Sequence, residues 1–95
     1  AQRAVAAAQG DAAAAQAVKG IEDPLSRLVA AGVLFKAGRA SPEVIALAVD
    51  TASAQGWRRP LMAWLGVQLQ RAEQAGATDE AARIRRRLAL VQGER

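Results

Sequence analysis

Few side chains in this 95-residue sequence can do chemistry, because histidine, cysteine and tyrosine are all absent. Their absence removes imidazole bases, thiolate nucleophiles and the zinc sites that these ligands build. No two acids have the spacing of a di-metal helix motif, and no glycine pattern matches a phosphate-binding loop. Six acids stand out: Glu22, Asp23, Glu43, Asp50, Asp79 and Glu80. Most of them lie at the starts of predicted helices, where capping and the helix dipole explain them. We therefore predict no enzyme activity, no catalytic residue, no metal site, no cofactor and no small-molecule substrate.

Arginine clusters near the end of the chain, at Arg83, Arg85, Arg86 and Arg87. Residues 57–95 hold eight basic and four acidic residues, whereas residues 1–56 hold five of each, so the whole net charge of +4 belongs to the second part. Guanidinium groups bind phosphate and carboxylate, so nucleic acid, an acidic protein and a lipid headgroup are candidate partners. The alternative is a solvated helix face, because these arginines point in different directions around a helix and Arg83 has acids three and four residues before it.

A second basic cluster, Trp57-Arg58-Arg59-Pro60, has the composition of a protein-binding hot spot. Trp57 also precedes a predicted helix, where an apolar residue can instead staple onto the first turn. The two arginines are unfavourably placed, because the positive end of a helix dipole repels cations. That misfit indicates an external anion or an acidic neighbour. We predict a partner surface that unites Trp57, Arg58 and Arg59 with the Arg83–Arg87 stretch.

Helices must position these residues, because apolar positions recur at three- and four-residue spacing and no alternating strand pattern appears. Residues 1–20 are rich in alanine and should be helical, with a start that frays for lack of large apolar side chains. Four further helices have capping or proline signals at their starts, at Asp23-Pro24, Ser41-Pro42, Pro60 and Thr78. Their ends are indicated by Gly38, Gly56, Gly76 and Gly93.

Each of these four helices has an apolar stripe that should face the core. The stripes are Leu25, Leu28, Gly32 and Phe35, widened by Val29; Ile45, Ala48, Val49 and Ala52; Leu61, Trp64, Leu65, Leu69 and Ala72; and Ala81, Ile84, Leu88 and Val91. The third stripe is the clearest, and we expect Leu65 at its buried centre and Gly66 beside a closely crossing helix. Trp64 is expected to pack in the core, with the alternative that it floors a groove for a partner's helix.

One segment, with Leu65, Gly66 and Leu69, loosely resembles the first helix of a tetratricopeptide hairpin. The second helix departs from that pattern, since the positions expected to hold small or aromatic residues are Thr78, Ala82 and Arg85. We interpret the likeness as one between helical hairpins, without membership of the family.

The fold that these patterns predict is an all-α, water-soluble, compact bundle. Short connections make consecutive helices antiparallel neighbours, so residues 21–95 should form four main helices that close on one another, with residues 1–20 added at the N-terminus. No apolar run is long enough to span a bilayer, since the longest is Leu28–Phe35.

The leading functional prediction is a non-catalytic protein–protein interaction or assembly-adaptor domain, which binds a protein partner or a second copy of itself. The soluble part of an envelope lipoprotein is one form that such a domain could take. The alternative is a nucleic-acid-associated helical protein that uses the C-terminal arginine cluster. The sequence leaves the compartment open between the cell envelope, or periplasm, and the cytoplasm.

Overall fold

A computed structural model describes residues 12–93, and it confirms the all-α prediction. Residues 12–19 form a short helix, and no strand occurs anywhere in the described range. Four longer helices follow: α2 (Pro24–Lys36), α3 (Pro42–Gln55), α4 (Arg58–Gln74) and α5 (Thr78–Gly93). The prediction that the first helix frays at its start falls on residues outside the described range.

Side-chain caps explain where α2 and α3 begin. The carboxylate of Asp23 accepts hydrogen bonds from the backbone N–H and the hydroxyl of Ser26, at 2.9 and 2.7 Å. The hydroxyl of Ser41 accepts one from the backbone N–H of Val44 at 3.3 Å. These bonds satisfy N–H groups that have no partner within the helix, so each helix starts where the local sequence predicts.

Glycines explain where α2, α3 and α4 end. Gly38, Gly56 and Gly76 have φ angles of 72°, 70° and 72°. This is the left-handed conformation, which glycine adopts readily because it has no Cβ. The predicted helix ends at these three glycines are confirmed.

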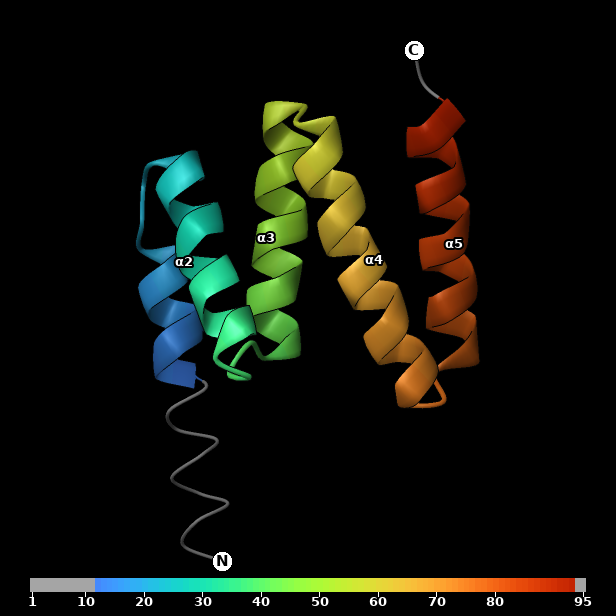
Figure 1. Cartoon of the computed structure of the whole chain (residues 1–95), viewed down its shortest axis with the longest axis horizontal. Coiled ribbons are helices and arrows are strands. Elements are labelled where there is room, and N and C mark those ends of the chain that lie inside the picture. Colours follow the sequence, from blue (N-terminus) through green and yellow to red (C-terminus); the bar gives the residue numbers. More distant parts are fainter. Residues whose placement is uncertain (1–11, 94–95) are drawn as a thin grey trace, which may run out of the picture.

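The four longer helices pack in chain order, α2 against α3, α3 against α4 and α4 against α5. Figure 1 shows them as a row in which α2 and α4 run one way and α3 and α5 the other. Other pairs among the four have no close backbone approach, so the expectation that all four close on one another is wrong. Each short connection joins only neighbours, and nothing in the described range brings α5 back to α2.

The core lies around α3, which has helices on both sides. Ile45, Ala48 and Val49 of this helix are at most 1% exposed, and Leu65 of α4 is fully buried, as predicted. The predicted stripes of α3, α4 and α5 all face this core, and three of their members lie at its edge. Those half-buried members are Trp64, Leu69 and Leu88.

The predicted stripe of α2 is partly wrong. Leu28 and Ala31 are buried, but Leu25 and Val29 are each 60% exposed, and Phe35 is 39% exposed. This helix is apolar on most of its surface, so periodicity could not decide which side packs. The side that contains Ala31 packs against the core, because small side chains let the backbone of a neighbouring helix approach closely.

The prediction of a close helix crossing at Gly66 is also wrong. A Cβ atom built at Gly66 would have no heavy atom within 4 Å, and the same holds for Gly32. Both glycines therefore lie in helices where an alanine would fit.

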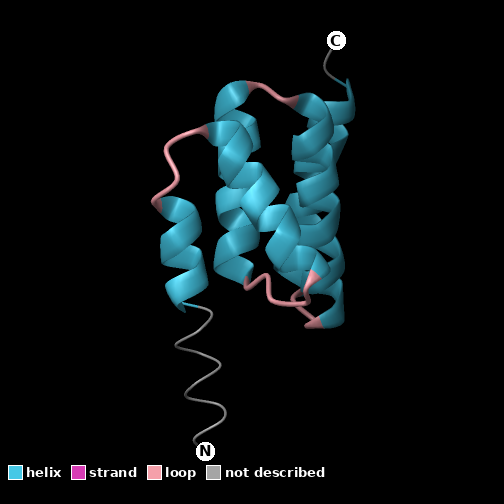
Figure 2. Cartoon of the chain, turned by 60° about the vertical axis from the view of Figure 1, so that its left-hand side comes forward, coloured by secondary structure: helices cyan, strands magenta, loops and turns pink. Residues whose placement is uncertain are grey.

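The short helix of residues 12–19 is held by two buried side chains and by an arginine. Ala15 and Val18 are 1% and 2% exposed. The guanidinium of Arg27 donates to the carbonyl of Ile21 at 2.7 and 2.9 Å and to the Thr51 hydroxyl at 3.3 Å. Figure 2 shows this helix at the edge of the fold, joined to α2 by a loop. Arg27 thus ties that loop to α2 and α3.

Candidate partner-binding surfaces

The basic start of α4 lies beside the end of α5. Nη2 of Arg58 donates to the backbone carbonyl of Gln92 at 2.7 Å. The last carbonyls of a helix lack intrahelical partners and carry the negative end of its dipole, so a cation is stabilised there. The sequence argument that Arg58 is unfavourably placed therefore considered only one of the two helix dipoles that act on it. The stabilisation comes from α5 and not from the helix to which Arg58 belongs.

A cavity of about 470 Å³ lies where α3, α4 and α5 meet at this end. It is lined by Ser53, Gly56, Arg58, Leu61, Arg87, Leu90 and Val91. Two predicted site residues from distant parts of the chain, Arg58 and Arg87, therefore share one cavity. Between them lie apolar side chains, of which Leu90 is 70% exposed. We call this set of seven residues the Arg58–Arg87 cavity.

The other predicted arginines do not line this cavity. Arg85 forms a salt bridge with Glu73, at the opposite end of α4 from Arg58. Arg59, Arg83 and Arg86 are exposed and have no hydrogen bond or ion pair within residues 12–93. The structure therefore brings Arg58 and Arg87 to one cavity and pairs Arg85 with Glu73, and the predicted partner surface stays a prediction.

The two tryptophans have different environments. Trp57 is half-buried and packs against the core from the N-cap position of α4, without a capping side-chain bond. Trp64 is also half-buried, and its ring meets that of Phe35 edge to face at a centroid distance of 6.0 Å. Trp64 lines a shallow groove between α2 and α4, together with Gly32, Phe35, Lys36, Ala63 and Val67. Both of its predicted roles, core contact and groove floor, therefore stay compatible with its position.

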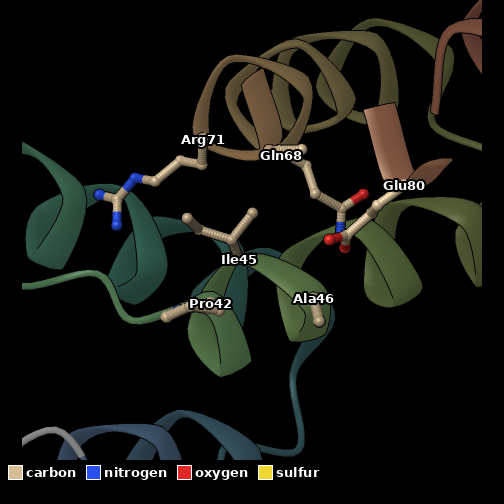
Figure 3. A pocket seen from close by; sticks show the side chains of 7 residues that line it. Pro42, Ile45, Ala46, Gln68, Arg71 and Glu80 are labelled. Carbon is tan, nitrogen blue, oxygen red and sulfur yellow. The ribbon is translucent and has the colours of Figure 1, made fainter. Parts of the chain in front are cut away.

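A smaller cavity of about 200 Å³ lies between α3 and α4, with Glu80 of α5 at its edge. Figure 3 shows Gln68 and Glu80 on one side of it and Arg71 extended to the other. The guanidinium of Arg71 donates to the carbonyl of Ala40 at 2.9 Å, so this cation holds the loop between α2 and α3. The cavity brings together one carboxylate and one engaged arginine, which is not a pair for acid–base catalysis.

Two further surfaces were not identified from the sequence. One is the exposed side of α2, where Leu25, Val29 and Val33 are 60–61% exposed. The other is an apolar groove between α2 and residues 14–21. Leu25 and Val29 were predicted to face the core, because hydrophobicity alone does not distinguish a core contact from an exposed ridge.

Within residues 12–93 no three acidic side chains are close enough to share a metal ion. In the same range, no helix combines the length and the apolar character that crossing a bilayer requires.

No family model, curated protein or solved structure matches this chain. The loose likeness of α4 to a tetratricopeptide helix therefore stays an interpretation of the sequence.

Proposed function

We propose that this chain is a non-catalytic protein–protein interaction or assembly-adaptor domain that holds an acidic segment of its partner at the Arg58–Arg87 cavity. The observation that carries the proposal is that Arg58, from the start of α4, and Arg87, from the second half of α5, line one cavity together with apolar residues. A partner side chain could bury apolar surface there while a neighbouring carboxylate meets the arginines.

The two arginines have donors left for such a carboxylate. Arg87 is half-buried and has no hydrogen bond or ion pair within residues 12–93, so all five of its N–H donors are available. Arg58 uses Nη2 for the carbonyl of Gln92, which fixes the guanidinium at the cavity wall. A guanidinium that is already held loses less conformational entropy when it binds a carboxylate.

A titration monitored by NMR tests the proposal on the full, isotope-labelled chain. The probe is a peptide of alternating Glu and Leu, and a peptide of alternating Lys and Leu is its control. We expect amide shifts at Ser53, Gly56 and Leu90 with the acidic peptide only. Equal shifts with both peptides would contradict the proposal.

Matched variants separate a site from general positive charge. Arg87→Ser should weaken binding of the acidic peptide by about tenfold, the effect of losing one charge-assisted contact of about 1.4 kcal/mol. Arg86→Ser removes the same charge from the neighbouring, exposed position and should change binding little. Equal weakening by the two variants would mean that the peptide responds to net charge alone.

A duplex DNA oligonucleotide as a further probe tests the nucleic-acid alternative. Binding through several phosphates weakens steeply as salt rises, and it should depend on Arg83, Arg86 and Arg87 alike. DNA binding of that kind, tighter than binding of the acidic peptide, would replace the proposed function.

A further inference from the structure

Three aliphatic side chains form an exposed ridge along α2. Leu25, Val29 and Val33 follow one another at four-residue spacing, which puts them on one face of a helix. They are 60%, 60% and 61% exposed. Helices pack by inserting such ridges into the grooves of another helix. We call these three residues the α2 ridge.

The surface on both sides of the α2 ridge is also apolar. Val33 lines the groove that α2 forms with Ala17 and Ile21 on one side. On the other side, Gly32 lines the groove that contains Trp64. A helix laid along the ridge would therefore bury apolar surface on both flanks, beyond the three ridge residues themselves.

Opposite charges stand at the two ends of the ridge. Glu22 precedes α2 and Lys36 is its last residue, and both are exposed. The ion pair that the structure shows within residues 12–93, between Arg85 and Glu73, involves neither of them. The carboxylate of Asp23 is already bound to Ser26, so Glu22 is the free acid at the start of the ridge.

We propose that the α2 ridge is a self-association surface, on which a second copy of the chain lays its own α2 in the antiparallel direction. Glu22 and Lys36 are each seven positions from Val29, and Leu25 and Val33 are each four positions from it. A two-fold axis at Val29 therefore sets Val29 against Val29 and Leu25 against Val33, and it brings Lys36 to the start of the other copy's α2, which Glu22 precedes. A symmetric dimer requires such a self-complementary surface.

The positions of Glu22 and Lys36 favour a second copy of the chain as the partner, and they favour the antiparallel direction. A second copy in the antiparallel direction forms two Glu22–Lys36 pairs, whereas a parallel copy would bring like charges together. α2 has 13 residues and so is about 20 Å long. A contact of this length is smaller than a standard interface of about 800 Å² per partner, so the dimer should be reversible and form at high protein concentration. This surface is separate from the Arg58–Arg87 cavity, so either proposal can fail without the other.

Sedimentation of the full chain over a broad concentration series tests the proposal. We expect a monomer–dimer equilibrium that Val29→Asp abolishes, because the two aspartates would meet on the axis. Leu90→Asp is the matched control, since Leu90 is 70% exposed on α5 and its replacement should leave the dimer intact. A wild-type chain that stays monomeric throughout, or a dimer that Val29→Asp leaves intact, would overturn the proposal.

A charge exchange tests the antiparallel direction without touching apolar surface. Lys36→Glu alone and Glu22→Lys alone should each weaken the dimer several-fold, since each places like charges opposite one another. The double variant Glu22→Lys with Lys36→Glu should restore it. Additive weakening in the double variant would exclude the pairing that we propose.

Cross-linking supplies a readout that does not depend on affinity, because the natural chain has no cysteine. Val29→Cys should form a disulfide-linked dimer on mild oxidation, since residues on a two-fold axis between packed helices approach within disulfide reach. Leu90→Cys serves as the control for random collision. Equal cross-linking rates for the two variants would count against the axis at Val29.

Discussion

At the scale of single residues, exposure separates side chains that the sequence pattern treats alike. Leu65 is fully buried between helices, whereas Leu90 is 70% exposed beside the Arg58–Arg87 cavity. Both are leucines inside helices, so truncation to alanine changes helix propensity equally at the two sites. Any difference in the free energy of unfolding then reports packing alone.

Leu65→Ala should lower the free energy of unfolding by about 2–5 kcal/mol, because it removes buried methyl groups and leaves a cavity. Leu90→Ala, the control, should change it by less than about 0.5 kcal/mol. Urea unfolding curves of the two variants check this prediction. A loss under about 1 kcal/mol for Leu65→Ala would mean that Leu65 does not lie at the centre of the core.

The stability that the Asp23 cap contributes to α2 depends on pH. The side-chain and backbone hydrogen bonds from Ser26 stabilise the charged carboxylate and lower the pKa of Asp23 below its usual value. A carboxyl with a lowered pKa stabilises the fold above its unfolded-state pKa, and that contribution is lost as pH falls through the folded-state pKa.

Asp23→Asn keeps the capping acceptor and removes the titration. The stability advantage of the natural chain over Asp23→Asn should therefore shrink as the solution becomes acidic. Melting temperatures of both proteins across the acidic range measure it. Ser41→Asn alters a cap that does not titrate and should differ from the natural chain by the same amount at every pH. A constant difference for Asp23→Asn would contradict the assigned role.

At the scale of helices, the sequence predicted boundaries well and facing directions less well. Caps and glycine stops act through local bonds and local φ angles, so Ser41 and Gly56 report helix ends without tertiary information. The buried face of α2 could not be predicted, because apolar residues cover most of the surface of this helix. Packing against the neighbouring helices determines which face is buried. That Arg58 and Arg87 line one cavity depends on how α4 and α5 pack, and local sequence patterns do not contain that information.

Substitutions at two glycines test whether local φ angles determine the effect of a glycine in these helices. Gly56 has a φ of 70° and Gly66 lies inside α4, and neither has a heavy atom near the place of a Cβ. Gly56→Ala should destabilise the fold by about 1 kcal/mol through backbone strain alone. Gly66→Ala should stabilise it by about 0.5–1 kcal/mol, because alanine favours the helix. Chemical denaturation would refute this if both changes had the same sign.

At the scale of the whole molecule, the packing in chain order has consequences for cooperativity. The backbones of α3 and α4 each have a helix close by on both sides, whereas the backbone of α5 closely approaches α4 alone among the four longer helices. A fold whose contacts run between successive helices behaves in part like a repeat array, in which an end can open while the centre stays folded. The central pair should therefore be the most stable part.

Native-state hydrogen exchange on two core variants tests this. Ile84→Ala weakens the contact of α5 with α4, and Leu28→Ala weakens that of α2 with α3; both parent side chains are buried, at 6% and 8% exposure. Amide protection should fall most in α5 for Ile84→Ala and most in α2 for Leu28→Ala, with α3 and α4 keeping the strongest protection in both. An equal fall across all four helices in both variants would show a single cooperative unit. The ends of the row would then be as stable as its centre.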